Sequence, residues 1–204
     1  MKRQRALQSG RPSTRQVIHR AATALFADRG YAATSTREIC QQAGITKPVL
    51  YYHFGNKQRL YQELILDAFN EYRKELLLAS RRGAETASRL VDVLEAMFTF
   101  VRRNPELSRL GFRMIFAPEK GAPMIDYDEM CKLDCRLMKG IVVKGVENGE
   151  MEGNPQDIAD ALAGIATLHI IDFLVTGKPA LNRPLARRAV DLLLHDRQGS
   201  SGGR

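Results

Sequence analysis

Apolar residues recur every three or four positions along almost the whole chain. After Asn56, for example, they fall at Leu60, Leu64, Ala68 and Tyr72, a spacing that places side chains on one face of an α-helix. Alternation of apolar and polar residues, which is typical of strands, is almost absent, and no Asn-Gly turn joins two alternating segments. The pattern therefore predicts an all-α fold.

Capping residues, glycines and prolines divide this pattern into separate helices. A Ser or Thr precedes several of the apolar runs and a Gly follows them, which are the residues preferred at helix starts and ends.

The segment 124–146 is apolar on two faces, one with Met130 and the other with Cys131. This pattern favours an interior position or a place between partners. The expected helices cover about 14–30, 36–44, 46–54, 57–81, 90–104, 105–116, 124–146, 158–177 and 184–195.

The positive charge is concentrated near the N-terminus. The 204-residue chain has a formal net charge of +8. Residues 1–60 contain 11 Lys and Arg against two acidic residues, a balance of +9, and the rest contains 20 against 21, a balance of −1. Such an asymmetry indicates that the N-terminal segment meets a polyanion, although a solvated basic surface is the simpler alternative.

Other features exclude several classes of protein. No apolar stretch follows the basic residues at the start, so a signal peptide is not expected. The longest charge-free apolar stretch, 161–171, is too short to span a bilayer, and three cysteines without framework spacing fit a reducing compartment. We therefore expect a cytoplasmic protein that does not enter a membrane.

Two short helices with a tight turn between them are the most informative feature. The first ends at Gly44, the turn passes through Ile45 and Thr46, and the second begins at Lys47, which is the layout of a helix-turn-helix. The major groove of DNA admits such a helix, and a Lys near its start can reach guanine O6 and N7. Plain packing of two short helices is the alternative, but the basic N-terminal segment favours DNA binding.

Residues 36–40, 43–45 and 50–54, together with Lys57 and Leu60, resemble the TetR family of transcriptional regulators. The resemblance implies an N-terminal helix-turn-helix three-helix DNA-binding domain followed by a larger helical ligand-binding and dimerisation domain. It also implies a homodimer joined by a four-helix bundle, a double-stranded DNA operator with two half-sites, and a cavity for a small effector. The implied DNA contacts are Thr36, Arg37, Thr46, Lys47, Pro48, Tyr51, Tyr52, His53 and Lys57.

Roles within this set follow from the side-chain chemistry. We assign Arg37 and Lys47 to bases. Thr36, Tyr52, His53 and Lys57 are assigned mainly to phosphates, and Tyr51 to either. Two positions depart from the family's common pattern: Cys40 replaces Ala, and Pro48 stands where Gly is frequent.

The resemblance also implies a domain division and a mechanism. We expect a flexible basic arm over 1–13, the DNA-binding domain over 14–60, the effector-binding and dimerisation domain over 61–196, and a disordered tail over 197–204. The expected function is repression, released by a small apolar or amphipathic effector. The long helix after Asn56 is the expected lever between the two domains.

Candidates for the effector pocket lie in the second part of the chain. They are mostly sulfur-containing or aromatic, and at helical spacing each also fits ordinary core packing. The set is Met97, Phe100, Met114, Phe116, Cys135, Met138, His169 and Phe173.

Two further chemistries remain as alternatives. Cys131 and Cys135 share a helix face and would suit a soft metal or a redox sensor, although buried cysteines are commonly core residues. No HExxH, phosphate-binding Gly-rich loop, GxSxG or CxxC motif occurs, so neither an enzyme nor a cofactor is expected.

Overall fold

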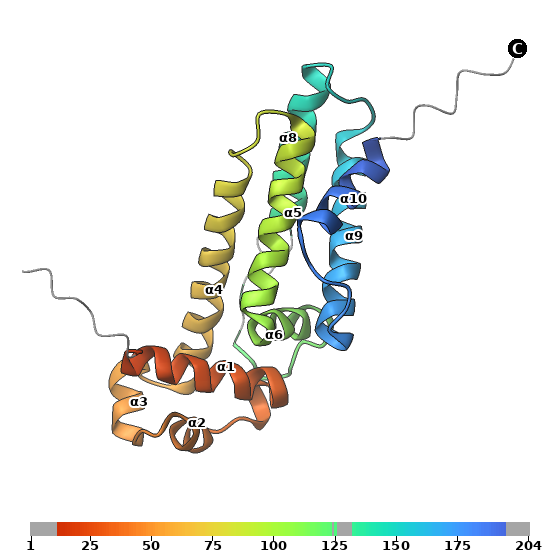
Figure 1. The fold of residues 1–204 in the computed structure, drawn as a ribbon. Coiled ribbons are helices and arrows are strands. Elements are labelled where there is room, and N and C mark those ends of the chain that lie inside the picture. Colours follow the sequence, from red (N-terminus) through yellow and green to blue (C-terminus); the bar gives the residue numbers. More distant parts are fainter. Residues whose placement is uncertain (1–11, 124, 126–131, 195–204) are drawn as a thin grey trace, which may run out of the picture.

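The computed structural model describes residues 12–123, 125 and 132–194, and this part of the chain contains helices and no strand. The first helices of the chain lie together at one end, and a bundle of the later helices extends away from them (Figure 1). The predicted all-α fold, with a small N-terminal helical domain and a larger C-terminal one, is confirmed.

The helices of the N-terminal domain begin at residues suited to capping. They are α1 (Thr14–Ala33), α2 (Thr36–Ala43), α3 (Lys47–Phe54) and the start of α4 (Lys57–Ala79). Ser13 and Ser35 form capping boxes with Gln16 and Glu38, so each Ser accepts from a backbone N–H and each N3 side chain accepts in return. The expected end of α1 at Gly30 is only a break, because the helix resumes and continues to Ala33.

The larger domain contains the remaining helices. They are α5 (Thr86–Arg103), α6 (Pro105–Phe116), α8 (Leu133–Glu147), α9 (Pro155–Thr176) and α10 (Arg183–Leu194). The expected helix over 124–146 is described only from Leu133 onward, and its Met130 and Cys131 lie outside the described residues. Most of the expected arm over 1–13 and the expected tail over 197–204 also lie outside them.

Two hydrophobic cores share the long helix α4. Its first turns contribute Leu60 and Leu64 to the N-terminal core, and its last turns contribute Leu76 and Ala79 to the core of the larger domain. Helix α6 also reaches the N-terminal core, through Leu110 and Met114. Both helices therefore connect the packed interiors of the two domains.

Helix α9 is apolar on more than its core face. It is long and apolar enough by composition to cross a membrane, yet it packs against α8, α10 and α5 in the bundle. Leu168 and Val175 of α9 are 59% and 78% exposed, and Leu192 of α10 is 70% exposed. These apolar side chains are left uncovered within the described chain.

A partly buried ammonium group joins the start of α4 to the end of α1 and the residue that follows it. Lys57 Nζ donates to the carbonyl oxygens of Tyr31 and Thr34 at 2.8 and 2.9 Å, and lies 4.0 Å from the centre of the Tyr31 ring. Burial lowers the pKa of Lys57, and Glu119 partly offsets this effect. These bonds hold the connection before α2 against the start of α4.

We expect Lys57→Met to lower the free energy of unfolding by about 1–3 kcal/mol, because two carbonyl oxygens lose a charged donor. The measurement is urea unfolding followed by circular dichroism. Lys47→Met is the matched control, since Lys47 is exposed and makes no hydrogen bond within the described chain. Equal stability of the two variants would contradict a structural role for Lys57.

Candidate nucleic-acid interface and ligand cavity

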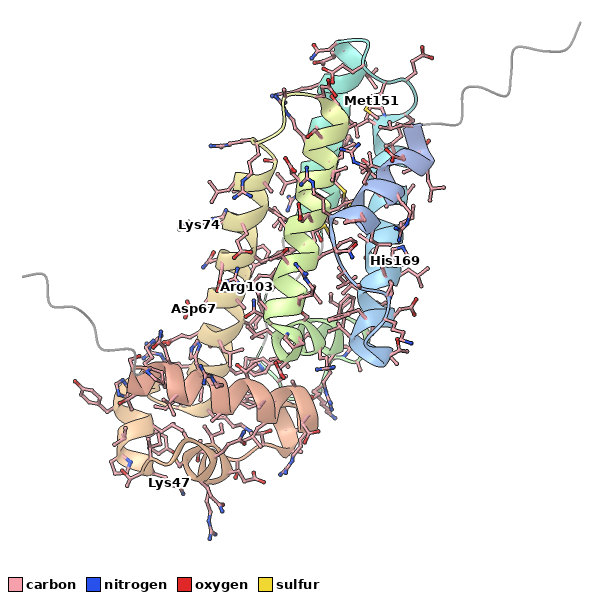
Figure 2. The ribbon with its side chains drawn as sticks, viewed as in Figure 1. Lys47, Asp67, Lys74, Arg103, Met151 and His169 are labelled. Carbon is pink, nitrogen blue, oxygen red and sulfur yellow. The ribbon has the colours of Figure 1, made fainter. Side chains whose placement is uncertain are left out.

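Helix α3 presents one face to solvent and buries the other. Leu50 and Phe54 are buried in the N-terminal core. On the outer side, Tyr51 is 44% exposed and Tyr52 is 86% exposed. Lys47 projects from the end of the molecule farthest from the bundle (Figure 2). The helix is thus held rigidly from behind while polar side chains line its outer face.

The turn before α3 depends on a left-handed glycine. Gly44 has φ 64° and ψ 34°, and its N–H donates to the carbonyls of Cys40 and Gln41. The N–H of Ile45 donates to Cys40 O at 3.0 Å. Only Gly adopts this conformation without steric cost, so Gly44 sets the angle between α2 and α3.

The other predicted contact residues surround this face. Arg37 is exposed in the first turn of α2, and Thr36 is half-buried beside it. Thr46 and Pro48 are exposed at the start of α3, and the Thr46 side chain makes no capping hydrogen bond.

Two of the predicted contact residues are partly engaged inside the domain. His53 is half-buried, and its ring packs edge-on against Tyr52 at 5.2 Å. The Lys57 ammonium is bonded to the Tyr31 and Thr34 carbonyls, and so differs from the free phosphate donor expected from sequence. The structure thus groups α2, α3 and the start of α4 at one end, with Lys57 turned inward.

Arg15 supports α3 from α1, and sequence reasoning gave it no role. Its guanidinium donates to Glu63 at 2.6 Å and to the His53 carbonyl at 3.4 Å, and lies over the Phe54 ring at 4.6 Å. Partners from α3 and α4 are brought together here by a residue of α1, and no local sequence signal indicates this contact.

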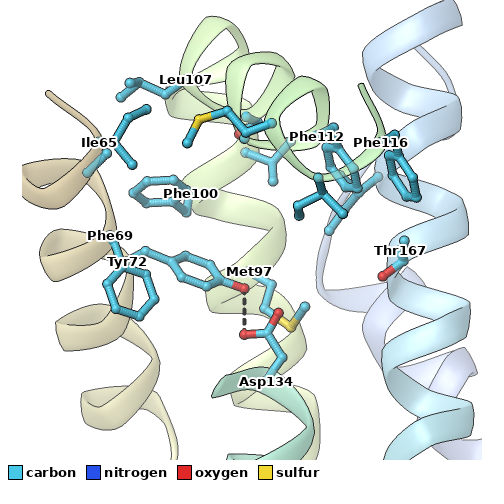
Figure 3. Close-up of a pocket in the computed structure, with 17 residues that line it drawn as sticks. Ile65, Phe69, Tyr72, Met97, Phe100, Leu107, Phe112, Phe116, Asp134 and Thr167 are labelled. Carbon is cyan, nitrogen blue, oxygen red and sulfur yellow. Dashed lines mark hydrogen bonds between the residues drawn. The ribbon is translucent and has the colours of Figure 1, made fainter. Parts of the chain in front are cut away.

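A cavity of about 330 Å³ lies in the larger domain, between α4, α5, α6, α8 and α9. Its wall is largely aromatic and aliphatic, and Figure 3 shows its phenylalanines. Ile115 and Phe116 line it and are also exposed, so it opens near the end of α6. Its size and apolar lining are those of a small-molecule site.

The structure separates the predicted pocket residues into two groups. Met97, Phe100, Met114 and Phe116 line the cavity, and Cys135, Met138, His169 and Phe173 do not.

The residues outside the cavity lie on other helix faces. Burial and the nearby Asp160 carboxylate raise the pKa of the Cys135 thiol. Met138 is fully buried in the core, against which Phe173 packs. His169 lies in a groove between α9 and α10, on the outer side of the bundle (Figure 2).

Tyr72 and Asp134 form a polar pair in the cavity wall that sequence reasoning missed. The Tyr72 hydroxyl donates to Asp134 Oδ1 at 2.8 Å (Figure 3). Burial raises the pKa of Asp134 from 3.8 to about 6, although the Tyr72 hydrogen bond opposes this shift. Burial and the neighbouring carboxylate raise the pKa of Tyr72 well above its usual value. The pair places one titratable carboxyl in an otherwise apolar wall.

A second missed cluster links the cavity wall to the N-terminal domain. Arg113 of α6 donates to Glu119 Oε1 at 3.0 Å, and Glu119 Oε2 accepts from the Ala32 N–H at 2.9 Å. Gly30 has φ 85° and lies against the Glu119 side chain. A Cβ atom at this position would be only 1.9 Å from Glu119 Oε1. The break in α1 thus makes room for this contact.

The metal and redox alternatives find little support in the described residues. No group of three or more His, Cys, Asp or Glu suited to a metal ion occurs within 12–123, 125 and 132–194. Cys131 lies outside the described residues. Burial raises the pKa of Cys135, which lowers the fraction of reactive thiolate.

Comparison with known proteins places these features in a family. The model of the bacterial regulatory proteins of the tetR family matches residues 18–64, which contain α2, α3 and their supports. The transcriptional activator FasR of Mycolicibacterium smegmatis is 35% identical over 96 residues, which are 47% of this chain and 42% of FasR. The chain thus spans less than half of that relative.

Two other proteins are similar over nearly their full length. YdgC of Bacillus subtilis, a helix-turn-helix transcriptional regulator, is 28% identical over 89% of this chain and 91% of its own. The structure of FadR from Bacillus subtilis in complex with stearoyl-CoA has a TM-score of 0.68 and 18% identity, over 88% of this chain and 97% of FadR. The last comparison concerns the fold alone.

The helix-turn-helix geometry coincides with the segment that the family model matches, and the larger helical domain follows it as in these relatives. The segment 18–64 therefore carries the DNA-binding domain of the bacterial regulatory proteins of the tetR family.

Proposed function

We propose that the protein is a cytoplasmic homodimeric repressor, bound to a roughly palindromic operator and released by a small apolar or amphipathic effector. The observation that carries the proposal is the outer face of α3. Its polar side chains are exposed, and buried Leu50 and Phe54 hold the helix rigidly behind them. A short helix fixed in this way enters the major groove without further ordering.

The contact residues keep the roles that their chemistry favours. Arg37 and Lys47 read bases, since both are exposed and make no hydrogen bond within the described residues. The proposed phosphate contacts are Thr36, Tyr52, His53 and Lys57, with Tyr51 at bases or phosphates. Thr46 and Pro48 belong to the same proposed contact surface without an assigned base or phosphate role. Because the Lys57 ammonium is turned inward, Lys57 acts through its place at the N-terminus of α4, where free N–H groups attract anions.

The exposed apolar face of α9 and α10 supports the homodimer. Leu168, Val175 and Leu192 would be covered when these helices pair with their copies in a four-helix bundle. His169, in the groove between the two helices, would then lie at the interface. In the proposed division, 14–60 binds DNA and 61–196 binds effector and partner.

Two helices would transmit the effector signal. Helix α4 belongs to both cores, and α6 lines the cavity and contacts α1 through Arg113 and Glu119. An effector that favours one arrangement of these helices would change the distance between the two recognition helices of the dimer. Strong release requires affinities for the two states that differ by several kcal/mol.

Lys47→Ala is expected to weaken operator binding by about 1–3 kcal/mol and to relax the base preference at one position of each half-site, because a base contact is lost. The measurement is fluorescence anisotropy with a sequence selected from random DNA by the wild-type protein, repeated with single-base changes.

Lys74→Ala is the control, since Lys74 is exposed on α4 in the bundle, away from α3 (Figure 2).

With about four phosphate contacts per subunit, the logarithm of the wild-type dimer's operator affinity should fall with the logarithm of salt concentration with a slope near −7. A slope near −2, or equal affinity of wild-type and Lys47→Ala, would contradict the interface.

Glu119→Gln is expected to reduce the effector's influence on operator affinity by about fivefold, a loss of roughly 1 kcal/mol of coupling, because the bonds that Glu119 accepts from Arg113 and from the Ala32 N–H are weakened. Effector affinity without DNA should stay the same, since Glu119 does not line the cavity. Calorimetry without DNA and anisotropy with DNA give the two quantities. Unchanged coupling would assign the signal to α4 alone.

Asp134→Asn is expected to stabilise the protein at neutral pH but not at low pH. The folded pKa of about 6 lies above the unfolded value of 3.8, so the folded state binds the proton more tightly and loses stability as pH rises between these values. Above pH 6 the variant should be more stable than wild type by up to about 3 kcal/mol. Urea unfolding at pH 4 and pH 7.5 measures this, and a pH-independent difference would contradict it.

A further inference from the structure

We propose that the cavity binds a lipophilic amine, whose protonated nitrogen donates to Asp134 while its hydrocarbon part lies against the phenylalanines of α5 and α6. This inference rests on the proposed function, because it specifies the chemical class of the effector.

The shape of the cavity accounts for the lipophilic part. The wall is formed by aromatic and aliphatic side chains, among them Phe69, Phe100, Phe112 and Phe116 (Figure 3). Phe112 and Phe116 stack in parallel with their centres 5.9 Å apart, and so form a flat surface beside the opening. Such a wall gains free energy from covering hydrocarbon, whatever group the ligand carries at its end.

The second carboxylate oxygen of Asp134, Oδ2, specifies the polar end of the ligand. Oδ1 accepts from Tyr72, and no described residue donates to Oδ2. This oxygen is open to the cavity rather than enclosed by the protein, so a ligand N–H or O–H inside the cavity would donate to it. The Tyr72 ring is held in turn by Phe100, edge-on at 5.0 Å, so the carboxylate has a fixed position.

The charge of the wall selects among ligands that can donate. Asp134 is the only charged side chain among the described residues that line the cavity, and no Lys, Arg or His is present there to receive an anion. A fatty acid would place a second carboxylate beside Asp134, whereas a protonated amine supplies the opposite charge. An alcohol donates a hydrogen bond without that charge and is expected to bind with intermediate strength.

The ionisation of Asp134 supports the same choice. Burial raises its pKa to about 6, so most of the carboxylate is charged at neutral pH yet poorly solvated.

The likeness to the FadR structure gives no argument for stearoyl-CoA as a ligand of this chain, because that comparison concerns the fold alone.

The test compares three probes of equal chain length, decylamine, decan-1-ol and decanoate, by calorimetry on the full-length protein at pH 7.5 and below their micelle concentrations. The amine should bind one molecule per subunit, at least tenfold more tightly than decanoate. Asp134→Asn should weaken amine binding at least tenfold and change decanol binding less than threefold. Asp160→Asn is the matched control, since Asp160 is an exposed carboxylate outside the cavity lining.

Several results would overturn the inference: decanoate binding more tightly than the amine, no binding of any probe, or equal amine affinity of wild type and Asp134→Asn. The comparison of probes on wild type needs no variant, so a folding defect cannot obscure it. Operator release is read separately by anisotropy. Decanoate that releases DNA would overturn the inference and leave the proposed function intact. Amine that binds through Asp134 without affecting DNA would uphold the site and oppose the proposed function.

Discussion

The packing of α6 against α1 connects the two halves of the molecule. Leu110 and Met114 enter the N-terminal core, and Met114 also lines the cavity together with Phe112 and Phe116 of the same helix. Interiors at native packing density resist small displacements, so a shift of α6 caused by a ligand must also move its neighbours in α1. The contact between Glu119 and the Ala32 N–H adds a directional bond to this apolar interface.

The basic residues of the N-terminal segment divide into two structural groups. Arg15 and Lys57 are used inside the domain, where they bond to carbonyl or carboxylate oxygens and fix α3 and the start of α4. Arg37 and Lys47 have no such partners among the described residues and remain exposed. The net charge therefore overstates the number of cations available to a polyanion, and the difference depends on which helices face each other.

The sequence was informative where the structure depends on neighbouring residues. The capping boxes of Ser13 and Ser35 and the left-handed turn at Gly44 are formed by groups within a few positions of one another. The same holds for the bounds of α6, which were expected at 105–116 and found there. By contrast, four of the eight expected pocket residues lie outside the cavity, because helical spacing identifies an apolar face without revealing what that face contacts.

The sequence by itself determined the helices, their order, and the short helix that follows a tight turn at Gly44, since each follows from local hydrogen bonding and the periodic burial of one face. Only the tertiary structure decided the pairing of Tyr72 with Asp134, 62 positions apart, and of Ala32 with Glu119, 87 positions apart. Such contacts depend on how packed helices bring distant segments together, and no short-range pattern records that geometry.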